Sequence, residues 1–218
     1  STEGSVGHTL RRLIATPLSI RAEIFLPVSL CLLTNHARRE EIERVYSHPQ
    51  ALAQCRRWLA ENLPRVEQCE TASTSAAGRQ ALVDPAGAAV GSRLTGEING
   101  LAILAADIED NPGNTTRFLV LGRGEGELTG RDKTSILFGT PHVPGALHQA
   151  LAPIARERIN LLRIESHPLR DRKWEYLFFA DLAGHREDEP VAGCLREMAN
   201  TTTFIKVLGS YARGEEGS

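Results

Sequence analysis

Arg123-Gly-Glu-Gly-Glu-Leu-Thr-Gly-Arg131 decides the fold, because it divides the chain into two parts. The stretch is rich in glycine and charged residues and has no apolar periodicity, as is typical of a linker. Periodic apolar patterns occur on both sides of it. We therefore expect a first domain over residues 1–122, a linker over 123–132 and a second domain over 133–213.

Downstream of the linker, strand and helix patterns follow one another in the order βαββαβ. The predicted strands are residues 134–138, 161–164, 174–182 and 203–208, and the predicted helices are 144–158 and 191–198. This order is typical of a ferredoxin-like fold, in which a four-stranded sheet carries both helices on one face.

The predicted strand over residues 174–182 is apolar on both faces. Tyr176 and Phe178 fall on one face and Leu177 and Phe179 on the other, because successive strand side chains alternate. Helices cover only one face of such a sheet. We expect the second face to pack against another subunit or domain, which favours a homodimer or a larger homo-oligomer.

Upstream of the linker, short apolar strands alternate with helix patterns, which predicts an α/β domain. The predicted strands are residues 19–26, 28–33, 66–71, 88–91, 103–108 and 116–122, and helices are expected to begin near residues 6, 49 and 74. The strand over 28–33 is apolar on both faces and is therefore expected to be central in its sheet.

Hydroxyl side chains stand where strands of this domain give way to helices, namely at Ser47, at Ser73 with Thr74, and at Ser92. In an open α/β sheet these strand ends line one crevice. Helix N-termini there offer N–H groups and a positive dipole end, so the crevice suits an anion. The alternative is that these hydroxyls only cap helices.

The bulk composition excludes several classes of protein. Of the 218 residues 41% are hydrophobic and 24% charged, and the net charge of −2 indicates no cationic surface for nucleic acid. The longest apolar run is strand-sized and no signal peptide is visible, so we expect a cytoplasmic protein without a membrane span. The cysteines Cys31, Cys55, Cys69 and Cys194 lack metal-ligand spacing and are expected to be small buried hydrophobes.

Six short blocks follow one another along the chain. They are Tyr46-Ser47-His48-Pro49-Gln50 with Gln54-Cys55, Ser73-Thr74-Ser75-Ala76-Ala77, Ala88-Ala89-Val90-Gly91-Ser92, Thr116-Arg117-Phe118 after Asp110-Asn111-Pro112, Gly145-Ala146-Leu147, and Glu165-Ser166-His167-Pro168. They resemble, in the same order, motifs of prephenate dehydratases and of their ACT domains. A lone Thr-Arg-Phe carries no weight, whereas six blocks in the family's order are specific. The resemblance covers essentially the whole chain.

The resemblance implies a fold and a reaction. The fold is an α/β catalytic domain of the periplasmic-binding-protein-like type II kind, incomplete at its N-terminus, followed by a ferredoxin-like ACT domain. The reaction is the decarboxylative dehydration of prephenate to phenylpyruvate in L-phenylalanine biosynthesis, a carbon–oxygen lyase step that needs no cofactor or metal. L-phenylalanine is the implied allosteric inhibitor, and the implied assembly is a homodimer or homotetramer.

Residue roles follow from the same resemblance. Thr116 would donate a hydrogen bond to the departing hydroxyl, and Arg117 would clamp a substrate carboxylate. The residues expected to bind substrate are Ser1, Ser47, Gln54, Ser73, Thr74 and Phe118, and those expected to bind the effector are Gly145, Ala146, Leu147, Glu165 and Ser166. Without the resemblance, Thr116 is an ordinary strand threonine and Arg117 belongs to a surface or structural ion pair.

Two features depart from the family's pattern. The family's catalytic domain begins upstream of Ser1, so the chain resembles a C-terminal part of it. His167 stands where the family usually has arginine, and histidine is shorter and mostly neutral at pH 7. The alternative function is therefore an amino-acid-sensing protein whose upstream half binds an anion without catalysis. An upstream chorismate mutase domain, and arogenate in place of prephenate as substrate, stay open.

Overall fold

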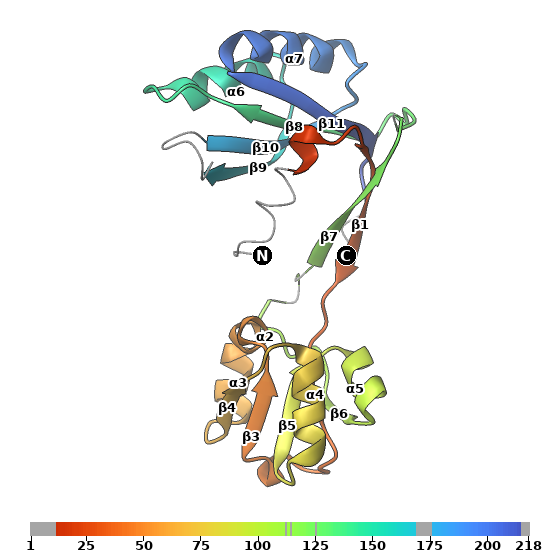
Figure 1. The fold of residues 1–218 in the computed structure, drawn as a ribbon, viewed down its shortest axis with the longest axis vertical. Helices are drawn as coiled ribbons and strands as arrows, with labels where there is room; N and C mark the ends of the chain where they lie inside the picture. The colour runs from red at the N-terminus through yellow and green to blue at the C-terminus, as the bar shows by residue number, and fades with distance from the viewer. Residues whose placement is uncertain (1–11, 112, 114, 125, 169–175, 215–218) are drawn as a thin grey trace. The chain divides into compact units, whose positions relative to one another are not determined.

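The structure is a computed structural model that describes the chain except residues 1–11, 112, 114, 125, 169–175 and 215–218 (Figure 1). Its contacts divide the chain into two units. Among the described residues, the α/β unit comprises Leu26–Thr116, and the ferredoxin-like unit comprises those up to Phe25 together with those from Arg117 to Gly214. The chain enters the α/β unit through β1 (Ser19–Pro27) and leaves it through β7 (Thr115–Gly122), and these two strands pair as a separate sheet.

The α/β unit is built on a five-stranded sheet with the order β4-β3-β5-β2-β6. Its strands are β2 (Cys31–Thr34), β3 (Arg44–Ser47), β4 (Glu67–Glu70), β5 (Gly87–Gly91) and β6 (Ala102–Ala105). β3 runs parallel to β4 and β5, whereas β2 is antiparallel to β5 and β6. β2 and β5 are buried along their whole length, as expected for central strands that are apolar on both faces.

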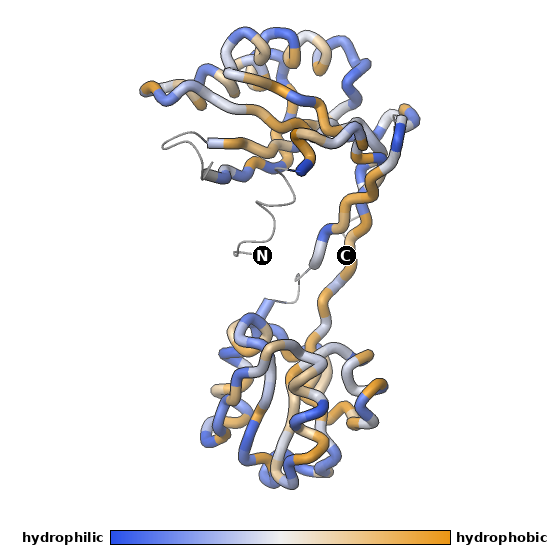
Figure 2. Tube along the Cα trace, viewed as in Figure 1, coloured by the Kyte–Doolittle hydropathy of each residue, from blue (hydrophilic) through white to orange (hydrophobic). Residues whose placement is uncertain are grey.

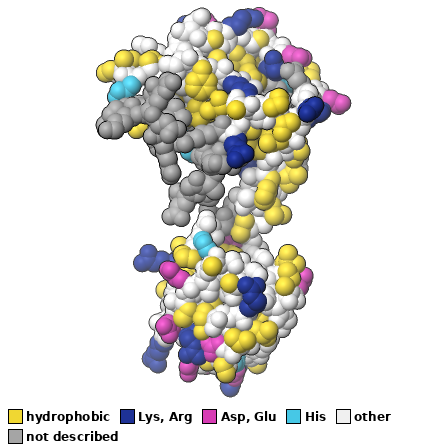
Figure 3. Space-filling model, viewed as in Figure 1, with side chains coloured by type: hydrophobic (Ala, Val, Ile, Leu, Met, Phe, Trp, Pro, Cys, Tyr) yellow, Lys and Arg dark blue, Asp and Glu magenta, His cyan; other side chains and the backbone are white. Residues whose placement is uncertain are grey.

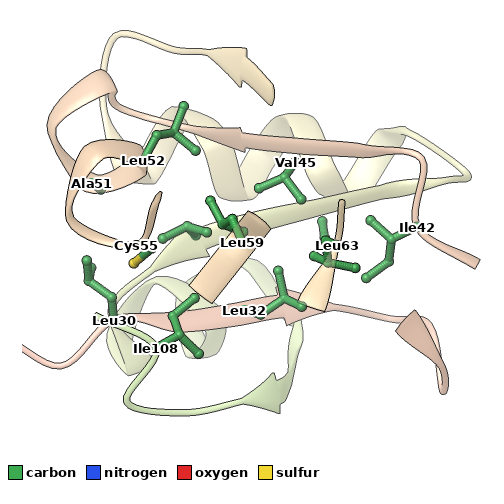
Figure 4. Packing of buried hydrophobic residues seen from close by; sticks show 12 residues of the cluster. Leu30, Leu32, Ile42, Val45, Ala51, Leu52, Cys55, Leu59, Leu63 and Ile108 are labelled. Carbon is green, nitrogen blue, oxygen red and sulfur yellow. The ribbon is translucent and has the colours of Figure 1, made fainter. Parts of the chain in front are cut away.

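Helices cover both faces of this sheet. They are α2 (Pro49–Gln54), α3 (Arg56–Asn62), α4 (Thr74–Val83) and α5 (Arg93–Asn99), together with the 3-10 helix η1 (Arg39–Glu41). On one face, Leu52 of α2 and Leu59 of α3 belong to a buried cluster with Leu32 of β2 (Figure 4). On the other face, Ala77 of α4 belongs to a cluster with Leu33. Full burial of a leucine stabilises by about 1.5–3 kcal/mol, so these clusters hold the helices on the sheet.

The ferredoxin-like unit has the predicted βαββαβ order. Its strands are β8 (Asp132–Gly139), β9 (Leu161–Pro168), β10 (Tyr176–Ala183) and β11 (Phe204–Ala212), and its helices are α6 (Ala146–Arg156) and α7 (Glu189–Thr201). The sheet order is β11-β8-β10-β9, with every neighbouring pair antiparallel. Both helices lie on one face (Figure 1), where Ile154, Cys194 and Met198 pack with Phe138 and Phe178. The predicted ferredoxin-like fold is confirmed.

The second face of this sheet is covered by the same chain. Leu137 and Phe179 of the sheet form a buried cluster with Leu13 and Ile20 of the N-terminal segment, and Leu119 of β7 packs against it. Apolar residues follow β1 and β7 along much of their length (Figure 2). Because the expected cover is supplied within the unit, this face gives no argument of its own for an oligomer, which stays a prediction.

A lysine anchors the N-terminal segment on β11. Residues 12–15 are helical, and Lys206 Nζ donates to the carbonyl oxygens of Leu13, Ile14 and Thr16 at 2.7, 2.9 and 2.8 Å. The last carbonyls of a helix have no partner within it, and a cation there is stabilising. The helix therefore ends on β11, just before Pro17.

Surface and thiol chemistry agree with an ordinary globular composition. On the face that Figure 3 shows, cationic and acidic side chains are interspersed. Among the described helices, none has both the length and the apolar character needed to cross a membrane.

Three of the four cysteines are buried, namely Cys31, Cys55 and Cys194, and Cys69 is half-buried. Burial raises the pKa of Cys55 to about 12 and that of Cys194 to about 11, so these thiols stay protonated and inert.

Candidate active site and effector site

The parallel strands of the α/β unit bring their carboxyl ends to one edge of the sheet. β3 ends at Ser47 and β4 at Glu70, directly across the ladder from it, and Thr71 N donates to Ser47 O at 2.8 Å. β5, parallel to β3, ends just before Ser92. The predicted common edge for the hydroxyl residues is therefore confirmed.

Ser47 faces the interior at this edge. It is 0% exposed, and its hydroxyl donates to the Val90 carbonyl oxygen at 2.7 Å. The hydroxyl thus ties β3 to β5 and presents no exposed donor. The neighbouring Tyr46 points to the opposite face, where its hydroxyl lies 2.8 Å from Asp84 Oδ2. A substrate-binding role for Ser47 stays a prediction, and it requires the hydroxyl to leave Val90.

The serines at the next two transitions cap helices. Ser73 Oγ accepts from Ala76 N at 3.1 Å, and Ser92 Oγ accepts from Thr95 N at 3.3 Å. The capping alternative therefore describes these two side chains. Thr74 is the first residue of the ten-residue α4, and its half-buried position leaves it at the positive end of the helix dipole. A cap and an anion site are compatible, since the cap satisfies only one of four terminal N–H groups.

Gln54 ends α2 next to a segment that sequence reasoning gave no role. Asp110 N donates to Gln54 O at 2.7 Å, and the Asp110 carboxylate accepts from Arg57 N at 2.9 Å and Trp58 N at 3.0 Å. The bond to Arg57 N, with that to Trp58 N, lowers the pKa of Asp110 in spite of its partial desolvation. Asp110 therefore caps the start of α3. The same contacts hold the segment that precedes β7 next to the end of α2.

Thr116 and Phe118 occupy the same side of β7, because strand side chains alternate. Thr116 is exposed, and the Phe118 side chain is 51% exposed. Arg117 and Leu119 point to the other side, where Leu119 packs on the ferredoxin-like sheet. The hydroxyl and the ring are thus available to a ligand, whereas the arginine is directed into the protein.

Arg117 is held by protein groups on all of its nitrogens. Its side chain is 10% exposed, and Nη1 donates to Asp181 Oδ2 at 2.5 Å. Nη2 donates to the Tyr211 hydroxyl at 2.8 Å, and Nε lies 2.7 Å from Glu23 Oε2 in an ion-pair contact whose angle is not that of a hydrogen bond. Burial opposes the charge of Arg117, but Asp181, Tyr211 and Glu23 outweigh burial and raise its pKa. In this geometry Arg117 contacts protein groups and is not positioned as a clamp for a substrate carboxylate.

The groups around Arg117 complete a charge-balanced cluster. Lys133 Nζ lies 2.7 Å from Glu23 Oε1. Ser135 donates its hydroxyl to Asp181 and lies 2.6 Å from the Tyr211 hydroxyl. Burial, and then the charge of Asp181, raise the pKa of Tyr211, which stays a neutral phenol. Sequence reasoning missed this cluster. Its signal was an acidic residue inside the apolar run Phe178-Phe179-Ala180-Asp181-Leu182.

The two effector motifs lie at one edge of the ferredoxin-like sheet. β8 and β9 are both antiparallel to β10, so they run in the same direction and end at the same edge. Gly145 begins α6 with a left-handed φ of +80°, which favours glycine. Ala146 is buried and Leu147 is 36% exposed. On β9, Ser166 is exposed and lies opposite Phe178.

The Glu165 carboxylate lies beside an arginine and a histidine. It pairs with Arg163, and its Oε2 lies 3.5 Å from Nε2 of His167. Burial raises the pKa of Glu165, but Arg163 and His167 outweigh burial, so the net pKa is lowered and the group is ionised. Its expected contact with the ammonium group of an amino acid stays a prediction, as does the contact of Ser166.

Ser1 lies outside the described residues, so the structure says nothing of its role. Within the part of the chain that the structure describes, no three histidine, cysteine, aspartate or glutamate side chains gather as a metal-ligand set.

Comparison with known proteins gives two family matches. Residues 1–126 match the family model described as prephenate dehydratase, and residues 134–200 match the ACT domain. The bifunctional chorismate mutase/prephenate dehydratase of Aquifex aeolicus is 46% identical over 97% of this chain and 58% of its own length. The chain therefore spans about three fifths of that relative.

Two solved structures resemble the whole chain. The prephenate dehydratase of Arthrobacter aurescens in complex with L-Phe is 37% identical, with a TM-score of 0.83 over 98% of this chain and 72% of that chain. A protein described as a novel type of quorum quenching acylase is 31% identical, with a TM-score of 0.77 over 93% of this chain and 75% of that chain.

Proposed function

The chain belongs to the prephenate dehydratase family, and we propose that its natural protein converts prephenate to phenylpyruvate and is inhibited by L-phenylalanine. The observation that carries this proposal is the pairing of two family matches in one order, a dehydratase region over 1–126 and an ACT domain over 134–200. The exposed Thr116 on β7 supplies the hydroxyl that the reaction uses.

The reaction is a balanced loss of carbon dioxide and water. The ring carboxylate of prephenate leaves as carbon dioxide, and its bonding electron pair enters the ring. The ring hydroxyl then departs and takes up one proton from solvent, which gives water and the monoanion phenylpyruvate. Because the product ring is aromatic, the step is driven without redox chemistry. The protein must hold two carboxylates and stabilise the departing oxygen.

Thr116 acts on the departing hydroxyl in this proposal. A threonine hydroxyl is a poor proton donor at neutral pH, so a full transfer from it is unfavourable. A hydrogen bond aimed at the leaving oxygen stabilises the charge that develops there, and such donors are worth about 10²–10³ in kcat. Phe118, on the same side of β7, would shape the pocket around the ring.

The carboxyl edge of the α/β sheet is the proposed carboxylate site. The N-terminus of α4 at Ser73 and Thr74 offers N–H groups and a positive dipole end. Gln54 stands at the same edge through its bond to Asp110. Ser47, and Ser1 by the family resemblance, complete the expected set. Arogenate is the alternative substrate and differs by an amino group in place of a keto group.

L-phenylalanine is the proposed effector of the ACT domain. The Arthrobacter aurescens structure, described as an L-Phe complex, aligns with 98% of this chain. Gly145, Ala146 and Leu147 would meet the ligand at the start of α6, and Glu165 and Ser166 would meet it from the end of β9. By the family resemblance the site lies at a subunit interface of a homodimer or homotetramer, so the ligand would favour one quaternary state. A cytoplasmic location fits this metabolic role.

Turnover of prephenate by the longest natural chain that carries this sequence tests the proposed activity. We expect phenylpyruvate to form, and Thr116→Val to lower kcat by about 10²-fold while the fold is kept. Thr115→Val is the matched control, since Thr115 precedes it on β7 and its hydroxyl donates to Gly113 O at 3.3 Å. No phenylpyruvate from wild type would contradict the proposal.

Assays of the same chain distinguish three other outcomes. Arogenate consumed faster than prephenate would change the substrate and keep the reaction. Hydrolysis of an acylated amine without prephenate turnover would place the chain with the acylase that shares its fold. L-phenylalanine binding without either activity would leave an amino-acid-sensing protein whose upstream half binds an anion.

A further inference from the structure

Arg117 follows Thr116 directly in the chain, and the two side chains point to opposite sides of β7. We infer that Arg117 is a positioning residue that fixes β7, and with it Thr116, on the ferredoxin-like sheet, rather than a ligand of a substrate carboxylate. This inference rests on the proposed function only for the role of Thr116. The anchoring of β7 itself does not depend on it.

The contacts of Arg117 span three strands besides its own. Asp181 belongs to β10, Tyr211 to β11 and Glu23 to β1, and each contacts a different guanidinium nitrogen within 2.8 Å. A guanidinium presents its donors in a fixed planar fork, so three partners in different directions define its orientation. β7 is therefore attached by its Arg117 side chain to the centre of the neighbouring sheet.

A substrate carboxylate would have to displace one of these partners. Asp181 is 1% exposed and also accepts a hydrogen bond from Ser135. It therefore cannot be solvated in its present position without losing these hydrogen bonds. Breaking a buried ion pair by removing one partner leaves an uncompensated charge, which is strongly destabilising. The cluster thus favours keeping Arg117 over releasing it to a ligand.

The charges of the cluster also balance without a ligand. The charges of Glu23 and Asp181 are balanced by Arg117 and Lys133, and the Ser135 and Tyr211 hydroxyls occupy remaining acceptor positions. Arg117 Nε is buried and makes no hydrogen bond, but Glu23 Oε2 lies 2.7 Å from it and occupies the position that a substrate carboxylate would take. The side of β7 that remains open is that of Thr116 and Phe118, both of which are exposed.

Hydrogen exchange of the 218-residue chain tests the anchoring without any need for turnover. Asp181→Asn keeps the shape of the side chain and removes its charge, and it should speed exchange of a peptide over residues 115–122 by about ten-fold. Glu197→Gln is the matched control, because it removes the same charge from an exposed pair with Arg156. The β5 peptide over 87–91 should be unchanged in both variants.

A second variant covers the case in which Asp181→Asn fails to fold. Tyr211→Phe keeps the ring and removes one hydroxyl, so exchange in residues 115–122 should rise by a smaller factor. Unchanged exchange of that segment in a folded Asp181→Asn protein, or in Tyr211→Phe when the first variant is unfolded, would overturn the inference.

Steady-state kinetics of the longest natural chain separate positioning from substrate binding. For a positioning role, Arg117→Lys and Asp181→Asn each lower kcat by about ten-fold or more with KM little changed, and the double variant is no worse than the single variants. A raised KM with unchanged kcat in Arg117→Lys, and no effect of Asp181→Asn, would identify a substrate ligand and overturn the inference. If wild type does not turn over prephenate, the proposed function fails while the exchange experiment still decides the anchoring.

Discussion

Lys133 Nζ lies 2.7 Å from Glu23 Oε1, and the two side chains are 7% and 0% exposed. The contact joins β8 of the ferredoxin-like sheet to β1, next to the Arg117–Asp181 pair. Buried charges are stable only as pairs, because each loses its hydration on burial. The two pairs together are neutral, which makes the cluster sensitive to the loss of any single charge.

Neutralising either Lys133 or Glu23 alone should therefore lower the free energy of unfolding disproportionately, compared with neutralising both. Lys133→Met and Glu23→Gln each leave one uncompensated buried charge, and each should lower the free energy of unfolding by about 3–5 kcal/mol. The double variant restores neutrality and should cost clearly less than the sum. Urea unfolding of the four proteins measures this, with Arg156→Met and Glu197→Gln as the exposed pair worth about 0–1 kcal/mol. Strict additivity would contradict the cluster.

Gly209 should not tolerate a side chain. A Cβ at this position of β11 would lie 2.1 Å from the Ile20 carbonyl oxygen and 2.8 Å from its nitrogen, both backbone atoms of β1. Gly209→Ala should force β1 away and cost about 1–3 kcal/mol. Gly193→Ala is the contrast, because its Cβ would meet only Arg196 Nη2 at 3.9 Å inside helix α7. That variant should stabilise by about 0.5–1 kcal/mol. Equal thermal shifts for both variants would refute the close approach.

Asp84 should give the α/β unit an acid-dependent contribution to stability. Arg44 donates to both of its carboxylate oxygens at 2.6 Å, and this bond holds the pKa of Asp84 well below its ordinary 3.8. A depressed carboxyl pKa stabilises the fold above the unfolded value, and the contribution is lost as the pH falls through the folded value. Asp84→Asn should therefore lower the urea midpoint at pH 7 and lower it by clearly less at pH 2, where part of the contribution is already lost.

The matched control for that experiment is Glu43→Gln. Glu43 contacts Arg44 at 3.5 Å and its side chain is 72% exposed, so solvent screens the pair. Its loss should leave the midpoint unchanged at both pH values. The same loss of stability from Asp84→Asn at pH 7 and pH 2 would show that shape, and not ionisation, supports the unit.

The strand and helix order was predictable from the sequence because it depends on local periodicity. The βαββαβ pattern, the central strand now seen as β2 and the shared edge at Ser47 and Ser92 all follow from short apolar runs and the residues that end them. The role of Asp110 was not predictable in this way, because its carboxylate caps the start of α3 from 53 residues further along the chain.

The cluster around Arg117 was not predictable in the same way. Glu23, Arg117 and Asp181 are far apart in the sequence, and one chain carries no signal for which distant charges meet. The alternating pattern of β7 places Arg117 opposite Thr116, but it does not say which side is buried. The expectation that another subunit or domain covers the second face of the ferredoxin-like sheet was wrong, because Leu13 and Ile20 cover it. This contact and the Arg117 cluster both depend on packing between residues that are distant in the sequence.

Glu165 should contribute to effector binding by its charge. Its lowered pKa keeps it ionised at neutral pH, so it can accept from an ammonium group in competition with Arg163 and His167. Glu165→Ala should weaken L-phenylalanine binding by about ten-fold or more, as expected for one charge-assisted hydrogen bond. Glu197→Ala on the helix face is the control and should bind like wild type. Equal affinity of both variants would remove Glu165 from the effector site.

Calorimetric titration of the 218-residue chain with L-phenylalanine, with D-phenylalanine as the control, tests the central claim most directly. It reports on the ferredoxin-like unit that carries Gly145 and Glu165, and it does not depend on turnover. We predict saturable binding of the L-enantiomer and no heat of binding from the D-enantiomer. No binding of L-phenylalanine, or equal binding of both enantiomers, would contradict an ACT domain that senses phenylalanine.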